Sequence, residues 1–300
     1  MGETIILRAA DGFGTTAYVA RPAGKPKGGL VVVQEIFGVN HHMRGVADGY
    51  ARDGYVAIVP ALFDRIRPSI ELGYDEAAIA KGRELKGAST TDAALLDIAA
   101  ARDAIAGAGK LGVIGYCWGG FLAWVCATRL KGFAAGISYY GGGIGAVATE
   151  KPLCPVQFHF GEKDHAIPLT EVDKVKAAGH RSVEVHIYPA GHGFNCDERG
   201  SFDAASTKLA RGRALAFLDA HVAGIAPVKA AAPVAKPVAK KIVAKPPAKV
   251  AKPAAKKAPV AKAKKAVKPK ARTKPKSKAA PKRKAAAKKP APKRKVIRRR

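Results

Sequence analysis

The chain changes character near residue 225, and this break limits what each side of it can fold into. All 23 acidic residues lie before it, whereas residues 225–300 carry 29 of the 53 Lys and Arg residues. The last aromatic residue is Phe217, and 12 of the 20 prolines follow the break. Residues 1–224 therefore form a nearly neutral segment that can bury one sizeable core, and residues 225–300 form a separate, strongly basic segment.

Low sequence complexity marks the basic segment, in which the tetrapeptide PVAK recurs at 233, 237 and 259. High charge, scattered prolines and the lack of aromatic side chains leave too little apolar surface to offset the entropy of ordering. We therefore expect residues 225–300 to be disordered. Dense positive charge favours salt-sensitive binding to a polyphosphate chain, and without aromatic side chains a duplex suits it better than a single strand.

The positive charges expected to contact DNA or another polyanion are clustered Lys and Arg residues of this segment. They include Lys240, Lys241, Lys256, Lys257, Lys264, Lys265, Lys282, Arg283, Lys284, Arg298, Arg299 and Arg300. Two other interpretations stay open. The segment could serve only to keep the protein dissolved, or it could contact anionic membrane lipid.

The compartment is predicted from the N-terminus and the cysteines. The opening MGETIILRAADG is typical of a strand and a turn rather than a signal peptide, and no apolar run approaches a membrane span. The four cysteines show no C-x-x-C spacing. We expect free thiols in a cytoplasmic protein that could also associate with the nucleoid, and the sequence leaves open whether the folded segment is a monomer or an oligomer.

Residues 1–224 alternate between apolar runs typical of buried strands and segments with helical periodicity. The expected strands are 5–9, 16–20, 28–35, 55–62, 110–116, 132–140, 155–161 and 182–190. The expected helices are 41–54, 91–109, 121–130, 169–179 and 203–222. This alternation predicts an α/β fold with a mostly parallel sheet covered by helices on both faces.

Two glycine-rich stretches, GFGTTA at 12–17 and GGGIGA at 141–146, loosely match a dinucleotide-binding motif. That motif needs a strand before it and a helix after it to hold the pyrophosphate. The first stretch leads into a strand, and the second leads into a short segment that ends at a proline. We therefore expect no nucleotide cofactor.

The stretch VIGYCWGG (113–120) places Cys117 in a glycine-flanked turn after an apolar run. A buried cysteine that only packs needs no glycines around it. A nucleophile on a sharp turn between a strand and a helix does need them, and G-x-S-x-G is the pattern of that turn in α/β-hydrolases. Gly115 to Gly119 repeats this pattern with sulfur in place of oxygen, so Cys117 is predicted to be a nucleophile.

A thiol attacks as thiolate, so it needs a base, and the base needs an orienting acid. In α/β-hydrolases the acid and then the histidine follow the nucleophile, each on a loop after a later strand. Asp164 in FHFGEKDHAIP and His192 in IYPAGHGF stand in this order and at these places. Either residue alone could be a helix cap or an ordinary loop residue, but their combination with Cys117 favours a triad.

The stretch VVVQEIFG (31–38) ends a buried strand in a glutamate. Glu35 is either a helix cap or surface residue, or a carboxylate close to Cys117. An oxyanion hole would combine the N–H of Trp118 with an N–H from this earlier strand end. Phe63 and Tyr74 are candidates to line a substrate pocket, although aromatic residues more often belong to a core.

Four motifs, QEIFG, GYCWGG, GEKDHAIP and GHGF, together resemble the dienelactone hydrolase (carboxymethylenebutenolidase) family, over about residues 3–222. The resemblance implies a single α/β-hydrolase domain that opens an enol-lactone ring without metal or cofactor. It implies that Cys117 is the nucleophile, Asp164 the orienting acid and His192 the base. It further implies that Glu35 contacts the thiol and helps to generate the thiolate, and that the N–H groups of Ile36 and Trp118 form the oxyanion hole.

The sequence departs from this family in its arginines. The family binds the carboxylate of its substrate with arginines, one of them shortly after the catalytic histidine. Here Cys196 and Asp197 stand in that region, with Arg199 further on. The other arginine has no clear match, and the candidates are Arg65, Arg67 and Arg83.

Two functions of different classes follow from the two segments. The first is a lactone or ester hydrolase whose basic tail binds polyanions such as DNA. The second is a nucleoid-associated DNA-binding protein that uses the hydrolase fold as a scaffold, since the tail resembles the C-terminal tails of linker histones in composition. A complete triad favours the first.

Overall fold

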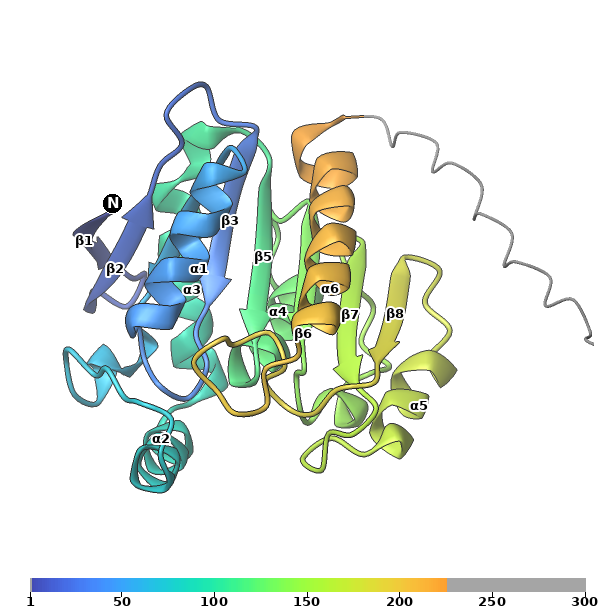
Figure 1. Cartoon of the computed structure of the whole chain (residues 1–300). Coiled ribbons are helices and arrows are strands. Elements are labelled where there is room, and N and C mark those ends of the chain that lie inside the picture. The colour runs from blue at the N-terminus through green and yellow to red at the C-terminus, as the bar shows by residue number, and fades with distance from the viewer. Residues whose placement is uncertain (1, 226–300) are drawn as a thin grey trace, which may run out of the picture. The chain divides into compact units, whose positions relative to one another are not determined.

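A computed structural model describes residues 2–225 (Figure 1). The predicted disorder and the polyanion contacts of the basic segment lie outside these residues, apart from residue 225. The described residues form eight strands: β1 (Glu3–Arg8), β2 (Gly14–Ala20), β3 (Gly28–Val33), β4 (Tyr55–Pro60), β5 (Leu111–Tyr116), β6 (Ala135–Tyr139), β7 (Val156–Gly161) and β8 (Val183–Tyr188). Six α-helices connect them: α1 (His41–Arg52), α2 (Glu76–Ala88), α3 (Thr91–Ala104), α4 (Trp118–Arg129), α5 (Leu169–Ala177) and α6 (Ala204–Leu218).

All eight strands belong to one sheet, in the order β1-β2-β4-β3-β5-β6-β7-β8. The first hairpin, β1 and β2, is antiparallel, and β2 also pairs antiparallel with β4. The remaining pairs are parallel. Figure 1 shows α1 and α6 in front of the sheet and α3 and α4 behind it. This arrangement is an α/β-hydrolase fold, and it confirms the predicted fold class.

The core lies on both faces of the sheet, where helices cover the strands. Every residue of β3, β4, β5, β6 and β7 is buried, as continuous apolar runs in a parallel sheet require. At the edge of the sheet, β8 is only partly buried, and Tyr188 is its one fully buried residue. None of the helices in residues 2–225 is long and apolar enough to cross a membrane.

The sequence prediction omitted α2 and shifted several element ends. Only three residues of α2 are buried, Ala78, Gly82 and Leu85, so its apolar periodicity is weak. Its start is fixed instead by Asp75, whose side chain accepts a hydrogen bond from the N–H of Ala78. The helix expected at 121–130 begins at Trp118, because the chain enters α4 directly after the turn at Cys117.

Candidate active site

The predicted site residues follow the carboxyl ends of four strands. Glu35 comes after β3, Cys117 after β5, Asp164 after β7 and His192 after β8. These strands are parallel, so their carboxyl ends meet at one edge of the sheet, which is the lower edge in Figure 1. Ligands of open α/β sheets bind at this edge.

A sharp turn holds Cys117 between β5 and α4. Its φ of +54° lies in the left-handed region, which is unusual for a residue with a side chain. A Cβ atom at Gly115 would lie 1.8 Å from the carbonyl oxygen of Gly119, and one at Gly119 would lie 2.2 Å from that of Val33. The two flanking glycines are therefore required by close backbone contacts around the turn.

Hydrogen bonds join Cys117, His192 and Asp164 in one chain. His192 Nε2 lies 3.1 Å from Cys117 Sγ, and His192 Nδ1 lies 2.7 Å from Asp164 Oδ2. The other carboxylate oxygen of Asp164 accepts hydrogen bonds from the N–H groups of Ala166 and Ile167. Because an ionised carboxylate only accepts hydrogen bonds, Nδ1 of His192 carries a proton, and Nε2 is the nitrogen that faces the sulfur.

The charge balance favours a protonated imidazole at His192. Burial alone would lower its pKa, but the hydrogen bonds to Asp164 and Cys117 and their negative charges outweigh burial and raise the pKa to about 10. The N-terminus of α4 adds a favourable environment for negative charge on the sulfur of Cys117. The arrangement therefore places a positively charged imidazole beside the sulfur of Cys117.

Cys117 differs in its surroundings from the other three cysteines, all of which are free. Cys117 is partly exposed, whereas Cys126, Cys154 and Cys196 are buried. Burial raises the pKa of the Cys154 and Cys196 thiols to about 11, and that of Cys126 further still. The prediction that Cys126 packs in the core is confirmed.

The two predicted oxyanion donors lie where α4 meets the end of β3. The close contact between Gly119 and Val33 brings the two segments together. On the other side, Gly82 of α2 packs against the carbonyl group of Ile36, where a Cβ atom would lie 2.3 Å from the oxygen. Within residues 2–225, the backbone N–H groups of Ile36 and Trp118 have no hydrogen-bond acceptor. Both donors are thus unoccupied.

Glu35 is completely buried and forms an ion pair with Arg199. Its Oε1 lies 3.3 Å from Arg199 Nη1, and its Oε2 has no hydrogen-bond partner in residues 2–225. Within that range no hydrogen bond joins Glu35 to the thiol of Cys117. The arginine that the buried carboxylate requires stands on the same loop as His192.

The ion pair between Arg199 and Glu35 could not be identified from the sequence. There, Arg199 appears only as an arginine some way beyond the position where the family binds the carboxylate of its substrate. One signal pointed to a partner for Glu35, since a carboxylate at the buried end of a strand needs compensation. Spacing could not select it, because the loop after His192 has no periodic structure. Of the other candidate arginines, Arg65 binds Asp11 and Asp97, and Arg67 and Arg83 are exposed.

The two predicted pocket residues have different surroundings. Phe63 is buried and stacks on the ring of Trp118, with centroids 5.3 Å apart. Tyr74 is partly exposed, packs edge-on against Phe37, and lies 5.9 Å from the guanidinium of Arg199. Tyr74 is therefore next to the Glu35–Arg199 pair, and Phe63 packs against Trp118. Their contact with a substrate stays a prediction.

Comparisons with known proteins agree with the fold and the motifs. The model of the dienelactone hydrolase family matches residues 15–222. A carboxymethylenebutenolidase of Pseudomonas putida is 33% identical over 227 residues, which cover 72% of this chain and 95% of that protein. A provisionally assigned carboxymethylenebutenolidase of Synechocystis is 35% identical over 224 residues, covering 67% and 89% respectively.

Among solved structures, a provisionally assigned dienelactone hydrolase of Klebsiella pneumoniae superposes with a TM-score of 0.64. It is 29% identical in sequence, and the match covers 72% of this chain and 98% of the Klebsiella chain. The family model therefore covers most of the residues that the structure describes.

The raised pKa of His192 predicts how its charge and its contribution to stability depend on pH. The charged imidazole stabilises the native state fully below its ordinary pKa of 6.5, and this contribution is lost as the pH rises through about 10. In a histidine NMR titration, His192 should keep its proton to about pH 10, and Asp164→Asn should move its midpoint down. An unshifted midpoint near that of a free histidine in the unmodified protein would contradict this.

Proposed function

The chain belongs to the dienelactone hydrolase family, and on that premise we propose that it hydrolyses lactones or esters through Cys117. The observation that carries the proposal is the chain of hydrogen bonds from Asp164 through His192 to the sulfur. In this arrangement Cys117 is the nucleophile, His192 the base and Asp164 the acid that orients it. No step of this mechanism calls for a metal or a cofactor.

In the acylation step, the thiolate of Cys117 attacks the carbonyl carbon of the substrate. The negative charge that develops on the carbonyl oxygen is stabilised by the unoccupied N–H groups of Ile36 and Trp118. When the carbon–oxygen bond breaks, a lactone of the dienelactone type releases an enolate. The enolate takes the proton from Nε2 of the His192 imidazolium, which leaves His192 neutral, and because a stabilised enolate is a good leaving group, a thiolate suffices as nucleophile.

In the deacylation step, His192, now neutral, removes a proton from a water molecule, which attacks the thioester carbon. The carbon–sulfur bond breaks, the carboxylic acid product leaves, and the sulfur returns to the thiolate. Asp164 holds the ring of His192 so that Nε2 faces this reaction throughout. The same imidazole thus serves both half-reactions.

Glu35 is proposed to assist the formation of the thiolate. Its Oε2 is buried and has no hydrogen-bond partner in the described part of the chain, so it can take the proton of the thiol before acylation and return it to the sulfur after deacylation. The ion pair with Arg199 keeps the rest of the carboxylate compensated. This role needs the thiol and Glu35 to approach each other when substrate binds.

Turnover of dienelactone and of simple aryl esters tests the nucleophile. Cys117→Ala should lower kcat by about a thousandfold or more, because the covalent pathway is lost. The matched control is Cys154→Ala, which removes a buried thiol and should keep most of the activity. Mass spectrometry should find the acyl group of a slow ester on Cys117.

Comparable turnover in Cys117→Ala and the unmodified protein would contradict the proposed nucleophile. An acyl group found elsewhere would do the same. Absence of turnover with every ester and lactone would instead favour the second candidate, in which the fold is a scaffold.

Glu35→Gln should slow acylation by about a hundredfold, a typical contribution of a proton-transfer group, with little change in KM. Glutamine keeps the size and the hydrogen-bonding capacity toward Arg199 but accepts no proton. Burst-phase kinetics separate acylation from deacylation. Glu150→Gln is the control, since Glu150 forms a surface pair with Arg129, and a Glu35→Gln variant as fast as this control would exclude the role.

For residues 225–300 we propose non-specific binding of DNA or another polyanion, which would make the enzyme a cytoplasmic, nucleoid-associated protein. The proposal rests on sequence alone: 29 basic residues and no acidic residue beyond position 225. Counterion release is the physical basis. A purely solubilising tail remains the alternative.

Gel-shift measurements at rising salt test the tail. Residues 1–300 should bind duplex DNA with an affinity that falls steeply with salt, and residues 1–224 should not bind. Hydrolysis and thermal stability should be almost the same in both forms. DNA binding retained by residues 1–224, or binding that ignores salt, would place the contact elsewhere.

A further inference from the structure

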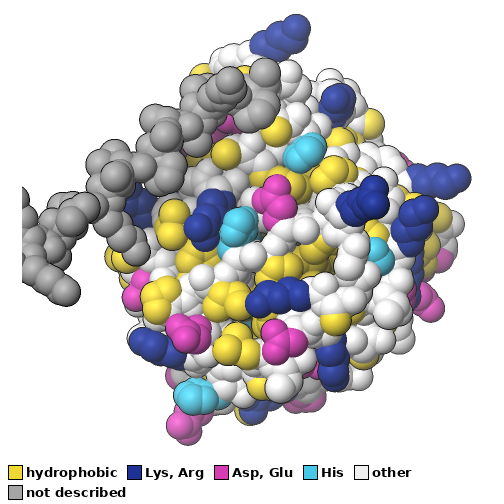
Figure 2. Space-filling view, turned by 90° about the vertical axis from the view of Figure 1, so that its right-hand side faces the viewer, with side chains coloured by type: hydrophobic (Ala, Val, Ile, Leu, Met, Phe, Trp, Pro, Cys, Tyr) yellow, Lys and Arg dark blue, Asp and Glu magenta, His cyan; other side chains and the backbone are white. Residues whose placement is uncertain are grey.

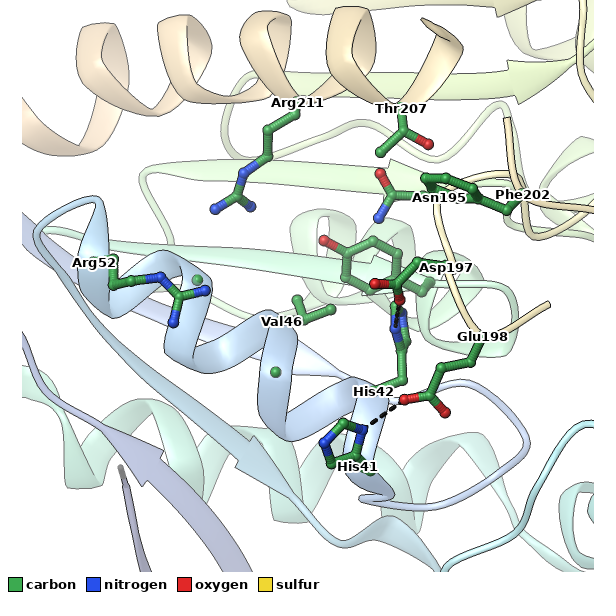
Figure 3. A pocket seen from close by; sticks show the side chains of 13 residues that line it. His41, His42, Val46, Arg52, Asn195, Asp197, Glu198, Phe202, Thr207 and Arg211 are labelled. Carbon is green, nitrogen blue, oxygen red and sulfur yellow. Dashed lines mark hydrogen bonds and ion pairs between the residues drawn. The ribbon is translucent and has the colours of Figure 1, made fainter. Parts of the chain in front are cut away.

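A groove of about 440 Å³ lies between α1 and α6, and Figure 3 shows the side chains that line it. Its third wall is the loop between His192 and α6, which contributes Asn195, Asp197 and Glu198. Tyr116, the residue before Cys117, also lines it. The mechanism proposed above uses none of these side chains.

Two guanidinium groups converge at one end of the groove, over Gly49 of α1. A Cβ atom built on Gly49 would lie 3.5 Å from Nη2 of Arg211 and 3.7 Å from Nη2 of Arg52, so these nitrogens are no more than about 7 Å apart. Figure 3 shows Arg52 reaching from α1 and Arg211 from α6. Because each N–H···O hydrogen bond spans about 2.9 Å, one carboxylate can contact both.

Part of this positive charge is still available to a ligand. Arg211 pairs with Asp53 and stacks on the ring of Tyr50, 3.8 Å away, which fixes its position. Arg52 is exposed and forms no ion pair with any described residue. An arginine has five N–H donors, so Arg211 keeps free donors beside Arg52.

The other end of the groove presents an accessible carboxylate. Asp197 lines this end, and its side chain is 72% exposed. Its Oδ1 lies 3.1 Å from Nδ1 of the buried His42, which holds the carboxylate in place. A ligand hydroxyl can donate a hydrogen bond to the other carboxylate oxygen.

The space between the two ends is open and partly apolar. Gly45 faces the groove, and a Cβ atom there would meet nothing within 4 Å. Val46 and the 41% exposed Phe202 provide apolar surface beside it. A ring or short carbon chain fits between the charged and the polar end.

We propose that this groove is a second binding site, for a small hydroxylated organic acid. Its carboxylate lies between Arg52 and Arg211, its carbon skeleton against Val46 and Phe202, and its hydroxyl at Asp197. A single carboxylate fits better than a phosphate dianion, because acidic side chains also surround the groove: Asp53, Asp197 and Glu198. Binding here does not depend on the proposed hydrolysis.

Calorimetry on the full chain tests the site with 4-hydroxybenzoate as the probe. We expect saturable binding at one site, weaker binding of benzoate, which lacks the hydroxyl, and weaker binding of 4-hydroxybenzamide, which lacks the charge. Arg52→Ala should weaken 4-hydroxybenzoate about tenfold or more, the size of a charge-assisted hydrogen bond. Gly45→Leu should remove binding by filling the groove.

Matched controls stand on α2, where Arg83 and Gly87 are exposed and a Cβ atom at Gly87 meets nothing within 4 Å. Arg83→Ala and Gly87→Leu should bind 4-hydroxybenzoate as the unmodified protein does. Both variants keep residues 225–300, so any binding of the acid to that basic segment is the same in all the proteins compared. No binding to the unmodified protein would overturn the proposal. So would equal binding of inorganic phosphate, or binding that Gly45→Leu and Arg52→Ala leave unchanged.

Discussion

The backbone of Cys117 is held in a left-handed conformation that costs a residue with a side chain about 1–3 kcal/mol. The surrounding contacts enforce it: β5 enters the turn, α4 leaves it, and the N–H of Cys117 donates to the carbonyl oxygen of Tyr139. The rest of the site depends on this one turn. It lifts the sulfur above the sheet, sets it at the start of α4 and brings it within reach of His192.

Two buried carboxylates also determine how the site is arranged. Asp164 and Glu35 are both buried, yet each is compensated differently. Backbone N–H groups and His192 satisfy Asp164, so its position is fixed by local hydrogen bonds. Glu35 relies on Arg199 from a distant loop, and one of its oxygens is left without a partner in residues 2–225. Asp164 is therefore held rigidly, whereas Glu35 keeps one carboxylate oxygen without a hydrogen-bond donor in residues 2–225.

Much of this architecture could be predicted from the sequence, because buried strands and tight turns accept only a few residue types at each position. Buried parallel strands require continuous apolar runs, and the sharp turn between β5 and α4 requires glycines at fixed offsets from Cys117. Together these placed Cys117, Asp164 and His192 at strand ends. The helix α2 escaped prediction because only three of its residues are buried. The pair of Glu35 with Arg199 escaped it because a loop without periodicity carries no signal of where its side chains point.

The unequal burial of the four thiols determines which of them reacts with oxidants. Peroxides and alkylating reagents react with thiolates, and a thiol that is buried in an apolar environment stays protonated and inert. Cys126, Cys154 and Cys196 are protected in this way, whereas Cys117 is partly exposed beside a charged imidazole. Oxidative damage would thus begin at a single sulfur and leave the folded core intact. The same selectivity makes Cys117 a unique position for attaching a probe to the unmodified chain.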